Sequence, residues 1–217
     1  MDKVKQFTHQ DYEITQTDVL YKSLYRYVRY HLRHKLFNGE WSNIMEREVM
    51  ERMSAAGILP YDPVLDKVVL ISQFRPGAIS PTTKDKAKSP WLYEIVAGVM
   101  DKDETPDRIA IREAKEEANC DILDIYPLNQ YFVSPGGSNE YMNIFCGRIS
   151  TQEINGVHGL AYEDEDIYAF TLTSEEAFEL LAAGVINTAP AIIALQWLQI
   201  NKGFIRDLWL TNRKKHG

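Results

Sequence analysis

The segment from Gly98 to Ile122 reads GVMDKDETPDRIAIREAKEEANCDI, and the rest of the chain is interpreted from it. Thr105 is suited to cap a helix, and Pro106 is suited to the first helical position, where its missing N–H costs nothing. No helix-breaking residue follows before Ala118. The segment therefore predicts a helix that begins at Pro106.

Three glutamates of this predicted helix, Glu113, Glu116 and Glu117, lie on one face because they are spaced three and four residues apart. Three carboxylates on one face repel one another. The arrangement is favoured where a hard cation such as Mg²⁺ binds between them, since carboxylate oxygens are the ligands that Mg²⁺ takes. Arg112 supplies a partial internal counter-charge. The alternative interpretation is a charge-rich helix that only faces solvent.

The composition is that of an ordinary globular protein, with 217 residues, 45% hydrophobic and 25% charged. The net charge of −7 argues against a protein that binds nucleic acid or an anionic membrane. No apolar run reaches membrane-spanning length, and the N-terminus lacks the apolar centre of a signal peptide. Cys120 and Cys146 stand outside any C-x-x-C motif, which favours buried free thiols in a reducing compartment. We expect a cytoplasmic protein.

Two regions are expected along the chain. Residues 1–44 are rich in strand-forming residues and contain the hairpin signal Asn38-Gly39, which predicts a small antiparallel β subdomain. This unit is too small to be stable alone, so its aromatic face is expected to pack on the main domain or on a second subunit. Residues 45–217 are expected to form the main α/β domain, with strands at 55–60, 68–74, 91–97, 122–126, 130–134, 143–148 and 167–172, and with later helices from Ser174 and over 189–200.

The predicted loop 156–166 carries four consecutive acids, from Glu163 to Asp166. A lone run of this kind is usually a solvated loop. Here it follows a carboxylate helix, and it offers that helix a further metal ligand and a general base.

The spacing of Gly98, Glu104 and the charged residues 112–117 resembles the Nudix box, G-x5-E-x7-R-E-U-x-E-E-x-G-U, in which U is a bulky aliphatic residue. Every charged position matches. Two positions depart from the pattern: Ala114 is small for its slot, and Asn119 replaces the last glycine. Asn is well suited to a left-handed helix end, so the turn is expected to survive.

Nearly the whole chain resembles the bacterial ADP-ribose pyrophosphatases, a branch of the Nudix hydrolases. The likeness is carried by LYKSLYRYVRYHLRHKLFNGEW, WLYEIVAG and GVHGLAYEDEDI, and by Pro135, fifteen residues past Cys120. The resemblance implies an α/β/α Nudix sandwich with a mixed sheet, preceded by the small β subdomain, in a homodimer that exchanges this subdomain. The loop 78–89 is longer than is usual in the family.

The resemblance also implies roles for individual residues. The cofactor would be Mg²⁺, with Mn²⁺ as an alternative. Its ligands would be the carbonyl of Ala97 and the carboxylates of Glu113, Glu117 and Glu165, with Glu116 supporting the cluster and Glu163 as the general base.

Substrate would be bound by a second set of residues from both regions. Leu24 and Tyr25 would bracket the adenine from a second subunit, although the family usually has an aromatic residue at the position of Leu24. For Arg52 and Arg75, an ordinary ion pair at the surface is the alternative role. The remaining matched positions are Arg47, Glu48, Val99, Ser134 and Glu140.

The expected function is Mg²⁺-dependent hydrolysis of ADP-ribose to AMP and ribose 5-phosphate. A first alternative is another nucleoside diphosphate sugar, such as GDP-mannose. A second alternative is a ligand-sensing Nudix domain without catalysis, but that function would require degenerate acids in the box, and here all of them are present.

Overall fold

The computed structural model describes residues 6–79, 89–100, 103–150, 154–160, 162 and 164–211. These residues form two compact units. The first contains the chain up to residue 53 together with residues 132–141, and the second contains residues 54–131 and the chain from 142 onward.

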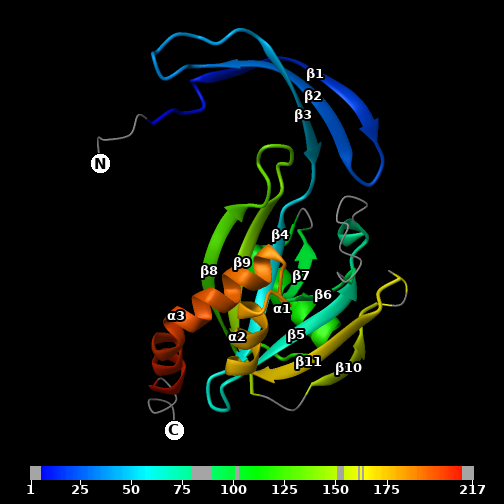
Figure 1. The fold of residues 1–217 in the computed structure, drawn as a ribbon, viewed down its shortest axis with the longest axis vertical. Helices are drawn as coiled ribbons and strands as arrows, with labels where there is room; N and C mark the ends of the chain where they lie inside the picture. Colours follow the sequence, from blue (N-terminus) through cyan, green and yellow to red (C-terminus); the bar gives the residue numbers. More distant parts are fainter. Residues whose placement is uncertain are drawn as a thin grey trace. The chain divides into compact units, whose positions relative to one another are not determined.

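The first unit is a three-stranded antiparallel sheet of β1 (Tyr12–Lys22), β2 (Arg26–His34) and β3 (Met45–Glu51) (Figure 1). The predicted hairpin at Asn38-Gly39 is present: Gly39 has a φ of 95°, and Lys35 pairs with Trp41 across the turn. The boundary expected at residue 44 falls between β2 and β3, and β3 continues the same sheet.

The segment 132–141 is tied to the end of β3. The N–H of Met50 donates to the carbonyl of Gly137 at 2.9 Å, and the N–H of Arg52 donates to Oδ1 of Asn139 at 2.8 Å. These bonds explain why a segment so distant in sequence belongs to the first unit.

The second unit contains an eight-stranded mixed sheet of order β10-β11-β5-β4-β9-β8, in which β6 also pairs with β5 and β7 with β4. The β4–β9 pair is parallel, whereas the pairs of β10 with β11, β11 with β5 and β4 with β5 are antiparallel. The strands are β4 (Ala55–Asp62), β5 (Lys67–Phe74), β6 (Trp91–Glu94), β7 (Val96–Val99), β8 (Asp124–Phe132), β9 (Tyr141–Arg148), β10 (Asn155–His158) and β11 (Ile167–Thr173).

Helices cover both faces of this sheet, as expected for an α/β/α sandwich. Along β4, Leu59 packs with α2 (Ser174–Ala182) and α3 (Ala189–Thr211), whereas the adjacent Ile58 packs with α1 (Pro106–Ala118). This alternation follows from the two-residue period of a strand. Each of the two cores buries one thiol, Cys146 on the α2–α3 side and Cys120 on the α1 side.

Local sequence explains the ends of the helices. Thr105 is extended and α1 begins at Pro106, as predicted. Asn119 adopts the left-handed conformation with a φ of 48°, so the substitution of the usual glycine preserves the turn. The N-cap of α2 is Thr173 rather than Ser174, because Thr173 and Glu176 form a capping box.

Four other expectations from sequence need correction. The strands predicted at 122–126 and 130–134 are one strand, β8, which runs through Pro127 at the edge of the sheet. The strand predicted at 91–97 is divided into β6 and β7, and the loop predicted from residue 156 begins with the strand β10. The last helix continues to Thr211 rather than ending near residue 200.

Asp66 joins the β4–β5 turn to both helices on one side of the sheet. Its carboxylate accepts from the Tyr61 hydroxyl at 2.8 Å and from Nζ of Lys202 at 3.0 Å, and its carbonyl accepts from the N–H of Ser174 at 2.8 Å. Although burial alone would raise the pKa of Asp66, hydrogen bonds from Tyr61, Lys202 and Ser174 lower it below 3.8.

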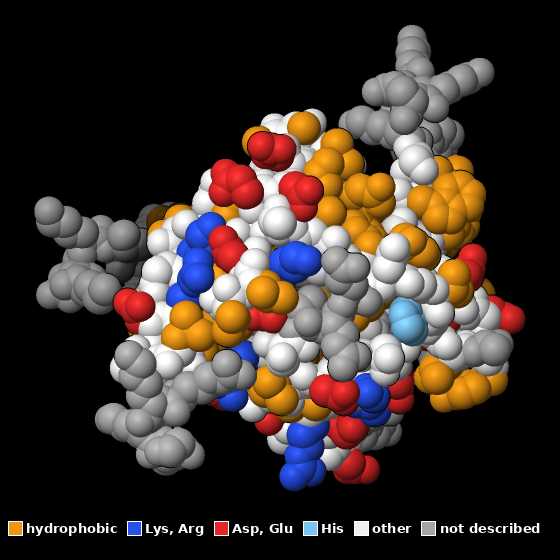
Figure 2. All heavy atoms as spheres, turned by 90° about the horizontal axis from the view of Figure 1, so that it is seen from below, with side chains coloured by type: hydrophobic (Ala, Val, Ile, Leu, Met, Phe, Trp, Pro, Cys, Tyr) orange, Lys and Arg blue, Asp and Glu red, His pale blue; other side chains and the backbone are white. Residues whose placement is uncertain are grey.

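Among the described residues, no helix combines the length and the apolar character needed to cross a membrane. On the face seen in Figure 2, acidic and basic side chains are interspersed with apolar ones.

Candidate active site

Glu117 is the most deeply buried acid of the α1 helix, at 3% exposure. Its Oε2 accepts a hydrogen bond from the N–H of Ala97 in β7 at 3.1 Å, which fixes the carboxylate against the sheet. Burial, together with the nearby charge of Glu113, raises the pKa of Glu117 to about 8, although the hydrogen bond from Ala97 opposes the change. The site therefore holds a carboxylate whose negative charge is not fully compensated by the protein.

Glu113 lies directly over Gly98 of β7, one helical turn from Glu117. A Cβ at residue 98 would overlap the carboxylate of Glu113, so the first glycine of the motif is required by close packing. Burial raises the pKa of Glu113, and the charge of Glu116 adds to this effect, while Arg112 opposes it.

Arg112 connects three acids of the motif. Its Nη1 lies 2.7 Å from Glu116 and 3.0 Å from Glu113, and its Nη2 lies 3.4 Å from Glu104. The guanidinium thus holds the carboxylates in place on one side of α1, as expected for a planar multidentate donor.

The acidic loop contributes Glu165 to the same unit. Its Oε2 accepts from the N–H of Leu160 at 3.0 Å, and the N–H of Gly159 donates to the carbonyl of Glu116 at 3.3 Å. The charge of Glu165 contributes to the raised pKa of both Glu113 and Glu117. The predicted general base, Glu163, lies outside the described residues.

These residues suit a hard divalent cation. The donors available are carboxylate oxygens, and the carboxylates of buried Glu117 and half-buried Glu113 repel each other, a condition that a bound cation relieves. Within the described ranges, no three Asp, Glu, His or Cys side chains converge closely enough to hold a metal. Glu113 instead pairs with Arg112, and Glu117 with the Ala97 N–H.

Two predicted substrate residues belong to this second unit. Arg75 follows β5, and its Nε lies 2.7 Å from Oε2 of Glu94 in β6. Val99 ends β7 and is exposed. Glu94 was not anticipated from sequence, because it stands outside the motif and its contact depends on the pairing of β5 with β6.

In the first unit, three predicted substrate residues come together although they lie far apart in sequence. The guanidinium of Arg52 stacks on the ring of Tyr25, 4.9 Å from its centroid, and its Nη1 lies 2.9 Å from Oε2 of Glu140. Leu24, beside Tyr25, is 80% exposed and does not join this cluster. Ser134 is exposed, and its carbonyl caps the turn by accepting from the N–H of Ser138 at 2.9 Å.

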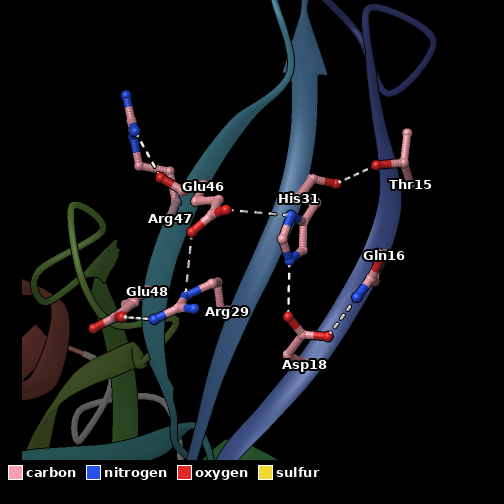
Figure 3. Close-up of polar contacts among 8 residues, drawn as sticks. All are labelled: Thr15, Gln16, Asp18, Arg29, His31, Glu46, Arg47 and Glu48. Carbon is pink, nitrogen blue, oxygen red and sulfur yellow. Dashed lines mark hydrogen bonds and ion pairs between the residues drawn. The ribbon is translucent and has the colours of Figure 1, made fainter.

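Arg47 and Glu48 are also in the first unit, on adjacent positions of β3, so their side chains point to opposite faces of the sheet. Glu48 accepts from Nη2 of Arg29 at 2.8 Å, within a network that includes His31 and Asp18 (Figure 3). The Arg47 side chain extends away from that network, and its Nη1 donates to the carbonyl of Glu46 (Figure 3). Among the described residues, no recorded contact links either side chain to the cluster of Tyr25, Arg52 and Glu140.

Comparison with known proteins identifies the second unit. The model of the NUDIX domain matches residues 51–196, a span that includes β4, β7 and the whole of α1. The chain belongs to the Nudix family. The Nudix box therefore corresponds to the cluster of Arg112, Glu113 and Glu117 packed on Gly98.

Several relatives are similar over nearly their whole length. A protein from Escherichia coli O6:H1 named ADP-ribose pyrophosphatase is 39% identical over 203 residues, which cover 94% of this chain and 95% of the relative. An ADP-ribose pyrophosphatase from Haemophilus influenzae is 35% identical over 96% of this chain and 95% of the relative. A GDP-mannose pyrophosphatase from Escherichia coli O1:K1 is 34% identical, but over 72% of this chain and 78% of the relative.

A solved structure described as an ADP compounds hydrolase shares the fold of this Nudix protein. The two superpose with a TM-score of 0.66 at 20% sequence identity, over 93% of this chain and 100% of the other. At this identity the likeness concerns the fold alone.

Proposed function

We propose that this Nudix protein hydrolyses the pyrophosphate of ADP-ribose to AMP and ribose 5-phosphate, with Mg²⁺ as the cofactor and Mn²⁺ as an alternative. The observation that carries the proposal is the extent of similarity. The relatives named ADP-ribose pyrophosphatase match 94–96% of this chain, whereas the GDP-mannose pyrophosphatase matches 72%. The intact acids of the Nudix box argue against a domain that only senses a ligand.

Glu113, Glu117, Glu165 and the carbonyl of Ala97 would hold the cation. A bound divalent cation supplies neutralisation of phosphate charge and activation of water, which are the two needs of pyrophosphate hydrolysis. The raised pKa values of Glu113 and Glu117 support this assignment, because a cation stabilises the ionised carboxylates that burial otherwise disfavours.

Other residues of this chain would transfer the proton, position the carboxylates and bind the phosphate. Glu163 would accept the proton of the attacking water, whose oxygen bonds to one phosphorus while the bridging P–O bond breaks, so that two phosphate monoesters leave. Arg112 and Glu116 would keep the carboxylates of α1 in position. Arg75 would bind a phosphate oxygen through its planar guanidinium.

The first unit would contact the adenosine side of the substrate, and here we propose a homodimer. Tyr25, Arg52 and Glu140 already form one cluster, with an aromatic ring and a guanidinium suited to a purine. The sheet also exposes several apolar side chains, among them Val19, Tyr21 and Leu24, which are 52%, 63% and 80% exposed. A surface of this kind is typical of an interface, and exchange of the β subdomain between two chains would cover it. A cytoplasmic location stays a prediction.

The test is a product assay with a substrate panel in Mg²⁺. ADP-ribose, GDP-mannose, ADP-glucose and diadenosine diphosphate are each incubated with the protein, and the products are separated by chromatography. We expect AMP and ribose 5-phosphate in equal amounts, with the highest kcat/KM for ADP-ribose. The Glu117→Gln variant is the control for a contaminating hydrolase. Preference for GDP-mannose would establish the first alternative, and binding of ADP-ribose without turnover of any substrate would establish the second.

A further inference from the structure

The ion pair between Arg75 and Glu94 is placed by the sheet itself. Ile71 of β5 is the antiparallel partner of Glu94 in β6, and the N–H of Arg75 donates to the carbonyl of Pro90 at 2.8 Å, which continues the pairing past the end of β5. Arg75 is extended, with φ −117° and ψ 107°. Its backbone therefore continues the extended path of the strand by one residue.

This ion pair lies on the face of the sheet that α1 covers. Val69 and Ile71 belong to the core on the α1 side, and the two-residue period puts Gln73 and Arg75 on the same side. Glu94 shares that side because directly opposed residues of paired strands point to the same face. The side chain of Arg75 thus runs back along the sheet toward Glu94, on the face where Glu113 and Glu117 lie.

Arg75 contacts Glu94 through Nε and not through its terminal nitrogens. Arg75 uses Nε, at 2.7 Å from Oε2 of Glu94, and in the described part of the chain no residue accepts from its terminal nitrogens. The Glu94 side chain is 14% exposed, whereas that of Arg75 is 43% exposed. A covered carboxylate therefore anchors the inner end of a guanidinium whose outer end meets no acceptor among the described residues.

The electrostatics agree with this geometry. The charge of Arg75 is close enough to lower the pKa of Glu117, against the dominant effect of burial. A guanidinium at this place faces the anionic side of the site, where both the carboxylates and a pyrophosphate would need positive charge.

We propose that Glu94 is a positioning residue for substrate binding, which holds Arg75 through Nε so that its two terminal nitrogens are presented as a preformed fork to a phosphate oxygen of a nucleoside diphosphate sugar. This inference rests on the proposed function of the site. Preorganisation of the fork improves binding, because an Arg side chain that is already ordered loses less conformational entropy when it binds a phosphate.

Steady-state kinetics of Glu94→Ala, Glu94→Gln, Arg75→Ala and the double variant test the proposal. Glu94→Ala is expected to raise KM for ADP-ribose about 10-fold with kcat changed less than about 3-fold, as for loss of a group that binds ground state and transition state alike. Glu94→Gln retains an acceptor for Nε and is expected to restore KM to within about 3-fold of wild type. The double variant should be no worse than Arg75→Ala, because Glu94 acts only through Arg75.

A matched control separates this role from general support of the fold. Lys202→Met removes another partly buried ion pair of the same unit, that with Asp66, and its KM should equal that of wild type. The inference is wrong if Glu94→Ala leaves KM at the value of the control, if Glu94→Gln is as harmful as Glu94→Ala, or if the effects of Arg75→Ala and Glu94→Ala multiply. If wild-type protein does not hydrolyse ADP-ribose, the proposed function fails instead, and the same variants are compared on the nucleotide sugar that it does hydrolyse.

Discussion

The carboxylate of Glu113 in α1 occupies the space that a side chain on Gly98 of β7 would need. The helix that carries the acids of the Nudix box is thus seated on a strand that has no Cβ at the point of contact. Beside this close approach, the N–H of Ala97 donates to Glu117 of the same helix at 3.1 Å.

Gly98→Ala is therefore expected to displace Glu113 and to lower kcat/KM at least about 10²-fold, in line with the loss of a well-placed electrostatic group. Activity and thermal unfolding are measured together, so that a folded but inactive variant is recognised. Gly203→Ala is the control, because a Cβ there meets nothing within 4 Å. Normal activity in Gly98→Ala would show that the position of Glu113 is unimportant.

Glu117→Gln is expected to lower turnover by at least about 10²-fold, because it removes a charged ligand from the proposed cation site. In the presence of a chelator the same variant is expected to unfold at a higher temperature than wild type. The reason is that a neutral amide at a position of 3% exposure avoids the cost of burying a carboxylate beside Glu113. Differential scanning calorimetry with and without Mg²⁺ measures both effects. A variant that is less stable than wild type in chelator would contradict the proposed repulsion.

Asp66 is expected to contribute stability that is lost in acid. Its pKa is lowered in the folded state below 3.8, so its contribution is fully present above the unfolded pKa and is lost as the pH falls through the folded pKa. Asp66→Asn is expected to cost about 1 to 2 kcal/mol of unfolding free energy at pH 7, since hydrogen bonds to a charged acceptor are weakened. Asn also tolerates the positive φ of 54° at this position.

Urea unfolding at pH 7 and at a series of lower pH values provides the measurement for Asp66. The difference between wild type and Asp66→Asn should shrink as the pH falls below the unfolded pKa. A difference that is independent of pH would mean that shape, and not charge, makes the residue stabilising.

Exchange of the β subdomain is expected to allow two inactive variants to restore each other. Tyr25→Ala affects the first unit and Glu117→Gln the second. In an exchanged heterodimer, one of the two sites receives both intact units and the other site neither. An equimolar mixture of the two variants whose subunits have exchanged should therefore reach about a quarter of the wild-type rate, since half of its dimers are mixed and each mixed dimer has one intact site of two.

The measurement is made on this equimolar mixture, at an ADP-ribose concentration below KM, and the separately purified variants are the control. If each active site is built within one chain, every site carries one substitution and the mixture is no more active than the average of its components.

Replacement of Asn119 by glycine is expected to stabilise the protein. The residue has a φ of 48°, a conformation that glycine adopts without the steric cost of a Cβ. Asn119→Gly should raise the unfolding free energy by about 0.5 to 1 kcal/mol, and Asn119→Ala should lower it. Chemical denaturation of both variants decides the matter, and destabilisation by glycine would show that the Asn side chain itself makes the turn.

The sequence predicted the elements that depend on local signals. The start of α1 at Pro106, the left-handed Asn119 and the Asn38-Gly39 hairpin are confirmed, because each is determined by residues within one turn of the chain. The α/β/α sandwich is also confirmed, since the likeness to a family extended over nearly the whole sequence.

The errors arise where tertiary context overrides local preference. Two strands were predicted at 122–126 and 130–134, but β8 is continuous through Pro127, because an edge strand can lack one N–H donor. The β10 strand exists because β11 pairs with it, and its short segment carries no strong signal of its own.

In the candidate site, too, only the features set by local sequence could be predicted. The spacing of the acids on α1 was visible in the sequence, whereas the stack of Arg52 on Tyr25 and the anchoring of Arg75 by Glu94 depend on chain segments that meet only in the fold. Glu94 lies within the segment WLYEIVAG, but only the register of β6 on β5 identifies Arg75 as its partner.

The two buried thiols can report how often each core of the second unit opens locally. Cys146 belongs to the core beneath α2 and α3, and Cys120 to the core beneath α1. Burial raises the pKa of Cys120 to about 12 and that of Cys146 as well, so neither sulfur reacts while its layer is closed. The rate at which a thiol reagent labels each cysteine therefore reports the local opening of one face of the sheet separately from the other. The wild-type chain thus carries its own pair of probes. If a divalent cation slows the labelling of Cys120 but not that of Cys146, the cation suppresses local opening of the core beneath α1 and not of the core beneath α2 and α3.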